Sequence, residues 1–309
     1  MTSLSSAKLK TSYNKSIEII KDHSKSFYQG FKQLPKEKFL AVASIYAFCR
    51  TVDDVADDSN DENKLESLKT LEAIEADILA LETGETIYND YVWWPAFTKT
   101  VADYSIPSLG FMMQLAGQRS DIHFVDIRDM EELIEYSRLV AGSVGRMLLP
   151  ILTSNEAHRK DPILNEACEN LGIAMQITNI LRDVGEDLSL RNRMYLPQTI
   201  LEKYKLSKET IKALIPPDKD SKEFKSFIQL WEELADVSDR YYASFNQHLP
   251  KLDDDSILPV YASAQIYRAI MDEVRENDYD CLTKRNYVNA TKKSQLLQKA
   301  KQDVVQLIS

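Results

Sequence analysis

Residues 35–57 read PKEKFLAVASIYAFCRTVDDVAD, an apolar run that ends among aspartates. A helix tolerates Pro35 in its first turn, because the N–H groups of that turn have no partner inside the helix. Asp53 and Asp57 are four residues apart, so both carboxylates lie on one face of the helix. The stretch therefore predicts a helix with an apolar body and an acidic end. Its apolar face holds Phe39, Val42, Ile45, Tyr46 and Cys49.

The same helical spacing of apolar residues continues through most of the chain. Glycine and proline are scarce, with 8 and 10 among 309 residues, which disfavours a sheet fold and its frequent turns. No long flexible linker and no internal repeat is evident. We therefore expect a single all-α domain of about ten helices over residues 1–309. Besides 35–57, the expected helical segments are 12–23, 63–82, 92–104, 107–120, 129–153, 161–185, 221–248, 256–277 and 290–307, with breaks at Gly84, Pro107, Pro150, Pro162, Pro197, Pro216, Pro217 and Pro250.

Charge and cysteine content exclude several classes of protein. The net charge of -10 disfavours nucleic-acid binding and electrostatic docking on anionic lipid. An anionic substrate stays possible, provided that metal ions or local arginines and lysines offset the repulsion. The three cysteines are widely spaced and form no CxxC pair, which is typical of reduced thiols in a cytoplasm. The N-terminus has no apolar signal-peptide core, and no apolar run reaches the ~20 residues of a membrane span.

A second acidic pair answers the first. Residues 181–188 read LRDVGEDL, where Asp183 and Asp187 again stand four residues apart. Like charges at this spacing cost a helix roughly 0.2–0.5 kcal/mol, and the cost rises when they are buried without a cation. One such pair is usually a solvated surface, and Asp54, Asp58 and Asp61 are expected to be that. Two pairs, each beside an arginine, favour a Mg²⁺ site shared with substrate phosphates.

The helix around the second pair carries a polar stripe. Gln176, Asn179, Asp183 and Asp187 are spaced 3, 4 and 4 residues apart in an otherwise apolar segment. Buried polar groups need partners, so this stripe predicts the lining of a site.

Upstream, Gly142 and Gly145 stand inside a helical pattern, where each costs about 1 kcal/mol against alanine. Either close packing of helices or a kink that makes room for a long ligand explains them. The sequence leaves both explanations open.

Three segments together resemble one known family. They are YAFCRTVDDVAD at 46–57, VAGSVG at 140–145 and QITNILRDVGEDLSLRNRMYLP at 176–197. The chain resembles the squalene/phytoene synthases, the head-to-head prenyl transferases, and within them the bacterial dehydrosqualene (4,4'-diapophytoene) synthases. The resemblance extends from HSKSF at 23–27 to YDCLTKR at 279–285.

The resemblance implies an isoprenoid-synthase helical bundle with a central cavity, prenyl diphosphate substrates and several Mg²⁺ ions. The implied metal ligands are Asp53, Asp57, Asn179, Asp183 and Asp187. The implied diphosphate contacts are Ser24, Lys25, Tyr46, Arg50, Arg182, Tyr267 and one member of the pair Lys284 and Arg285. Gln176 and Tyr195 would line the polar part of the site. Tyr136, Val140 and Ala141 would contact the reacting carbons, and Phe27 and Phe31 would line an apolar tunnel. Of these residues, Tyr46, Arg50, Tyr136 and Arg182 are the ones expected to take part in catalysis.

The implied reaction joins two farnesyl diphosphates through a cyclopropylcarbinyl diphosphate to give dehydrosqualene, a C30 carotenoid precursor. Metal ions and arginines would stabilise the leaving diphosphate, while an apolar cavity keeps water from the carbocation. Tyr136 or the released pyrophosphate would accept the final proton, and the sequence does not decide between them.

Chain length stays open at this point. Phytoene, the C40 product of two geranylgeranyl diphosphates, is the first alternative. Ala43 lies one turn before Tyr46 on the presumed cavity face, and its small side chain would leave room for a longer substrate. Phe31 argues for the shorter C30 product if it closes the tunnel.

Other readings concern cofactor and class. NADPH is not expected, since no glycine-rich dinucleotide fingerprint is present, but an NADPH-dependent squalene synthase remains an alternative. A class I terpene cyclase and an inactive helical assembly factor are the alternatives from other classes. Peripheral membrane contact is expected because the product is insoluble in water. The oligomeric state is not readable from the sequence.

Overall fold

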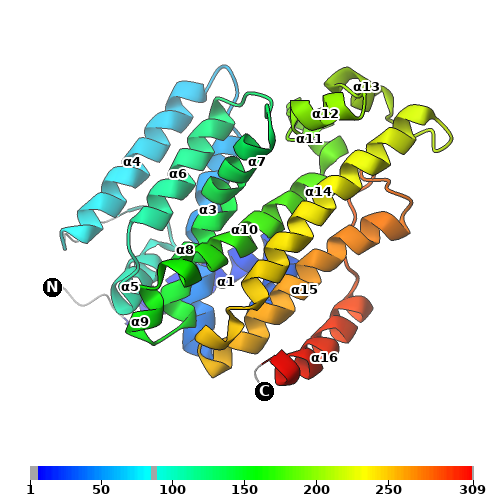
Figure 1. The fold of residues 1–309 in the computed structure, drawn as a ribbon. Coiled ribbons are helices and arrows are strands. Elements are labelled where there is room, and N and C mark those ends of the chain that lie inside the picture. The colour runs from blue at the N-terminus through cyan, green and yellow to red at the C-terminus, as the bar shows by residue number, and fades with distance from the viewer. Residues whose placement is uncertain (1–5, 85–88, 308–309) are drawn as a thin grey trace.

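The computed structural model describes residues 6–84 and 89–307, and in that part of the chain every regular element is a helix (Figure 1). The helices and single turns are α1 (Ser6–His23), α2 (Lys25–Phe31), α3 (Lys36–Asp57), α4 (Lys64–Glu82), α5 (Trp94–Tyr104), α6 (Leu109–Ile122), α7 (Met130–Ser137), the π-helical turn η1 (Arg138–Gly142), α8 (Ser143–Leu152), α9 (Glu156–Arg159), α10 (Pro162–Arg182), α11 (Val184–Arg191), α12 (Gln198–Lys203), α13 (Lys208–Ala213), α14 (Lys222–Asn246), the 3₁₀ turn η2 (Leu249–Lys251), α15 (Asp254–Glu276) and α16 (Ala290–Leu307).

The predicted all-α class and the long helices are confirmed. The predicted number of helices is too low, because short helices such as α2, α9, α12 and α13 have no long apolar period to reveal them. Pro150 does not break the chain: it lies inside α8, close to its end. The predicted 129–153 helix is interrupted by the π-helical turn at Arg138–Gly142.

Helix α10 lies at the centre of the bundle (Figure 1). It packs against α8 and η1, and also against α14 and α15. Helix α3 packs against α1, α5, α6 and α8, so the two helices that carry the acidic pairs belong to one helical assembly. None of the helices in 6–84 and 89–307 has the combination of length and low polarity that crossing a bilayer requires.

Two glycines allow α8 and η1 to approach α10 closely. A Cβ atom on Gly145 would lie 2.1 Å from the carbonyl oxygen of Cys168, and one on Gly172 would lie 2.2 Å from that of Ala141. These distances require backbone-to-backbone packing, the first explanation considered for Gly145. The second holds as well, because the π-helical turn disrupts the helix just before Gly145, and Gly145 itself lines a large cavity.

Replacing Gly145 with alanine is expected to destabilise the fold by about 1–3 kcal/mol, because two helices must separate to admit one methyl group. Thermal unfolding monitored by circular dichroism measures the loss. Gly142→Ala is the matched control: its nearest new contacts are at 3.3 Å, so it should cost much less. Equal losses for both variants would contradict the close-packing explanation.

Candidate active site

One cavity of about 1670 Å³ opens inside the bundle. Its volume exceeds the roughly 300–1,000 Å³ of an ordinary small-molecule pocket, so it has room for a very long ligand or for two ligands. Its walls come from α2, α3, α7, η1, α8, α10 and α15, with contributions from the ends of α1, α6, α11, α14 and α16.

The cavity gathers nearly all the residues singled out from the sequence. Its lining includes Ser24, Lys25, Phe27, Phe31, Tyr46, Arg50, Asp53, Asp57, Tyr136, Val140, Ala141, Gln176, Asn179, Arg182, Asp183, Asp187, Tyr195, Tyr267 and Arg285. Lys284 lies outside the cavity and pairs with Asp280 at 3.5 Å. Between the two candidates, the structure therefore places Arg285 at the site, where it lies 3.1 Å from Glu186 and 3.6 Å from Asp183.

Arginines bridge the two acidic pairs across the cavity. Arg191 lies 3.0 Å from Asp57 and 3.6 Å from Asp187, so one guanidinium joins the first pair to the second. Arg50 donates to Asp53 at 2.8 Å, and also pairs with Asp54. The two motifs thus face one another, as the shared-site hypothesis required.

The second motif does not lie on one continuous helix, as the polar stripe had suggested. Helix α10 ends at Arg182, and α11 begins at Val184. In a continuous helix the N–H of Gly185 would donate to the carbonyl of Leu181. Instead it donates to the carbonyl of Cys281 at 3.1 Å, and the Leu181 carbonyl accepts from the indole Nε1 of Trp231 at 3.0 Å. Both groups of the missing bond are satisfied elsewhere, so the break costs little.

The break leaves the acidic pair together. The N–H of Asp187 still donates to the carbonyl of Asp183 at 2.9 Å, which keeps the two residues one turn apart. Arg182 donates to the Asp183 carboxylate from Nε at 2.8 Å. Both side chains are largely buried, with 12% and 13% of their surface exposed.

The carboxylates of the two pairs are held in a setting that disfavours their charge. Burial, reinforced by the charge of Asp57, raises the pKa of Asp53 to about 7. Burial and the charge of Asp183 raise the pKa of Asp187 to about 7. Burial also raises the pKa of Asp121 to about 6. A bound cation would relieve this cost, because it favours the charged carboxylates.

These pKa shifts predict how stability depends on pH when metal is absent. The ordinary aspartate pKa is 3.8, so between about pH 4 and 7 the folded chain binds more protons at Asp53 and Asp187 than the unfolded chain does. The stabilisation is full below about pH 4 and is lost as the pH rises towards 7. Thermal unfolding in a chelator should therefore show Asp53→Asn gaining stability over the wild type across this range. A difference that does not change with pH would contradict the raised pKa.

The donor set fits a hard divalent cation such as Mg²⁺. The side-chain oxygen Oδ1 of Asn179 is buried and has no hydrogen-bond partner, although it lines the cavity beside the carboxylates. Within the described residues, no three acidic, cysteine or histidine side chains converge closely enough to bind a metal ion by themselves. That arrangement suits Mg²⁺, which takes one or two carboxylates and completes its shell with water and substrate phosphates.

Four charged residues of the cavity were missed from the sequence: Asp121, Arg191, Arg193 and Lys293. Arg191 and Arg193 fall within the third matching segment, and the excess of cations after the acidic pair was a usable signal. Asp121 and Lys293 stand in ordinary amphipathic helices, and only the tertiary fold brings them to the site.

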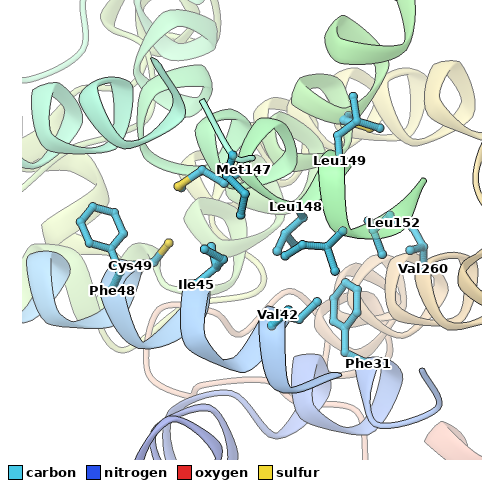
Figure 2. Close-up of a cluster of buried hydrophobic side chains, with 14 of the residues drawn as sticks. Phe31, Val42, Ile45, Phe48, Cys49, Met147, Leu148, Leu149, Leu152 and Val260 are labelled. Carbon is cyan, nitrogen blue, oxygen red and sulfur yellow. The ribbon is translucent and has the colours of Figure 1, made fainter. Parts of the chain in front are cut away.

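The opposite part of the cavity is apolar (Figure 2). Phe31, Leu148, Leu152 and Val260 line it, and the Phe31 ring packs against that of Phe27 with centroids 4.5 Å apart. The expectation for Ala43 was wrong. It is fully buried but is absent from the cavity lining, because the cavity face of α3 runs through Tyr46, Cys49 and Arg50 instead.

Comparison with known proteins gives the same picture. The family model described as squalene/phytoene synthase matches residues 20–292. A 4,4'-diapophytoene synthase of Staphylococcus haemolyticus is 33% identical over 95% of this chain and 97% of its own length. Phytoene synthase 3 of Zea mays is 32% identical over 94% of this chain, which spans 66% of that relative's length.

Solved structures agree with the fold. The crystal structure of a dehydrosqualene synthase with a ligand superposes with a TM-score of 0.85 at 31% identity, covering 97% of this chain and 99% of the other. A squalene synthase of Alicyclobacillus acidocaldarius superposes with a TM-score of 0.74 at 21% identity, covering 88% and 96%. The second likeness concerns the fold alone.

Proposed function

Because the chain belongs to the squalene/phytoene synthase family, we propose that it joins two farnesyl diphosphates head to head to give dehydrosqualene. One observation carries the proposal. A single cavity combines an acidic, arginine-rich end with an apolar end closed by aromatic and aliphatic side chains. A diphosphate head and a prenyl tail require that combination. The full-length similarity to a diapophytoene synthase supports the C30 product.

In this proposal Asp53, Asp57, Asp183 and Asp187, with Asn179, hold Mg²⁺. When bound, Mg²⁺ offsets the charge of the diphosphates and of the leaving pyrophosphate. Arg50, Arg182 and Arg285 donate hydrogen bonds to diphosphate oxygens, which strengthen as the C–O bond breaks. The apolar walls exclude water from the carbocation and hold the second double bond within reach.

Two lysines extend the anion-binding part of the cavity. Lys25 and Lys293 both line it, and burial, with the charge of Lys25, lowers the pKa of Lys293. No carboxylate forms an ion pair with either of them within residues 6–84 and 89–307. Two unpaired cations side by side are costly unless an anion binds between them. We assign them to a diphosphate oxygen of a bound substrate.

Lys293→Met is expected to raise KM for farnesyl diphosphate about tenfold while leaving kcat nearly unchanged, because a charge-assisted hydrogen bond is lost from substrate binding. Steady-state release of pyrophosphate measures both constants. Lys292→Met is the matched control: Lys292 forms ion pairs with Glu273 and Glu276 at 2.8 Å and does not line the cavity. Equal effects of both variants would remove Lys293 from the substrate site.

A product assay tests the proposed function as a whole. The protein is given Mg²⁺ with farnesyl or geranylgeranyl diphosphate, with and without NADPH, and the hydrocarbon is identified by mass. A C30 polyene from farnesyl diphosphate without NADPH is the expected result. A reduced central bond only with NADPH would mean squalene, and a C40 product from the longer donor alone would mean phytoene. A product without doubled carbon number would mean a cyclase, and no pyrophosphate release would mean an inactive protein.

The proposal includes release of the product at a membrane surface, because a C30 hydrocarbon is insoluble in water. Co-sedimentation with neutral lipid vesicles during turnover tests this. Product that stays with the protein in the supernatant would contradict it.

A further inference from the structure

A buried carboxylate holds two tyrosine hydroxyls at the wall of the cavity. The Tyr136 hydroxyl donates to Asp121 at 3.0 Å, and the Tyr195 hydroxyl donates to it at 3.0 Å. The two rings pack with centroids 5.1 Å apart. The three residues come from α6, α7 and the loop after α11, and all three line the cavity.

Arg193 completes the cluster. It donates to the backbone carbonyl of Asp121 at 3.0 Å and to the Tyr195 hydroxyl at 3.3 Å. Its guanidinium also lies 3.7 Å from the carboxylates of Asp57 and Asp121. The cluster is therefore connected to the first acidic motif through a single side chain.

The direction of these hydrogen bonds fixes what the tyrosines offer to a ligand. An ionised carboxylate can only accept, so both hydroxyl protons point at Asp121. Each hydroxyl oxygen then has only its lone pairs left for a ligand. Oxygen lone pairs are the negative end of the O–H dipole, and they stabilise positive charge that develops nearby.

We propose that Asp121 is a positioning residue that fixes the hydroxyls of Tyr136 and Tyr195 with their oxygen lone pairs available to a carbocation in the cavity. The inference rests on the proposed function for the identity of that carbocation. It concerns orientation, since Asp121 acts on the ligand through the two tyrosines.

A purely structural role explains the cluster less well. Asp121 is only 7% exposed, and burying a carboxylate to join three segments is costly when apolar packing would serve. The cost is explained if the carboxylate is needed to set the direction of two hydroxyls.

Asp121→Asn keeps the shape of the side chain and changes the direction of one bond. The amide oxygen accepts from one tyrosine, but the amide N–H₂ donates to the other, whose proton must then turn away. We expect kcat to fall about 100-fold, with KM for farnesyl diphosphate changing less than about threefold. Asp126→Asn is the matched control: Asp126 accepts from the backbone N–H of Met194 at 3.2 Å and pairs with Lys208, so it holds the same loop without touching the tyrosines.

A double-mutant cycle separates positioning from support. If Asp121 acts through Tyr136, the variant Asp121→Asn/Tyr136→Phe should be within about threefold of the slower single variant in kcat. Effects that multiply would overturn the proposal, as would a kcat of Asp121→Asn close to that of Asp126→Asn.

A binding measurement needs no turnover. A farnesyl analogue with a tertiary ammonium at C1 mimics the cation, and its uncharged carbon counterpart is the reference, each titrated calorimetrically with pyrophosphate and Mg²⁺. Asp121→Asn should weaken only the ammonium analogue, by about tenfold. Equal weakening of both analogues, or of neither, would overturn the proposal. A wild-type protein that forms no condensed product would contradict the proposed function instead, and this binding contrast would still decide the role of Asp121.

Discussion

Asp53→Asn should abolish product formation, lowering kcat by about 100-fold or more, while the helical circular dichroism spectrum stays unchanged. The substitution removes one negative charge from the acidic end and keeps the size of the side chain. Asp183→Asn should act in the same way, because the two residues belong to motifs that face each other across one cavity. The loss concerns cation binding, so calorimetric titration with Mg²⁺ and pyrophosphate should weaken in parallel.

The fold should tolerate this change. The pKa of Asp53 is raised to about 7 by burial and by Asp57, so its charge opposes folding near neutral pH, and the neutral amide relieves that cost. The lost ion pair with Arg50 acts in the opposite direction but is half exposed, and exposed pairs contribute little.

Asp61→Asn is the matched control. Asp61 is exposed and lies beyond the end of α3, outside the cavity. Its substitution should leave kcat, KM and Mg²⁺ binding unchanged. Near-normal turnover of Asp53→Asn would show that the first acidic pair does not hold the metal.

The sequence predicted the long helices and the two acidic pairs for one reason. Both signals are periodic, and a helix converts spacing in sequence directly into a shared face in space. Asp53 and Asp57 are therefore placed correctly without knowledge of the fold. Their facing position across from Asp183 and Asp187 needed the matching family motifs in addition.

Features set by tertiary contacts were out of reach. The break at Asp183 depends on Trp231 and on the Cys281 carbonyl, which are about 50 and 100 residues away in sequence. Ala43 was misplaced because one turn of α3 presents several apolar residues, and only packing against other helices decides which of them faces the cavity. Asp121 carried no motif at all, since its meaning comes from two tyrosines on other segments.

Phe31→Ala should change the product length. The Phe31 ring is 3% exposed, lines the apolar end of the cavity and packs against Phe27, and it lies close to Leu152 and Val260 (Figure 2). A farnesyl chain that ends at this ring leaves no space for the further isoprene unit of geranylgeranyl diphosphate. Removing the ring opens that space. We expect kcat/KM for geranylgeranyl diphosphate to rise at least about tenfold, with C40 hydrocarbon appearing in mixed-substrate assays.

The variant carries a stability cost of about 3–5 kcal/mol, so the milder Phe31→Leu should be assayed beside it and should show a smaller shift in the same direction. Val42→Ala separates loss of packing from opening of the tunnel. Val42 is fully buried beside Phe31 in the core but does not line the cavity (Figure 2). It should lower the melting temperature without admitting the longer substrate. If Val42→Ala and Phe31→Ala shift the product equally, loosened packing sets chain length. If neither does, the tunnel ends at another residue, and the apolar wall formed by Leu148 and Leu152 becomes the next boundary to test.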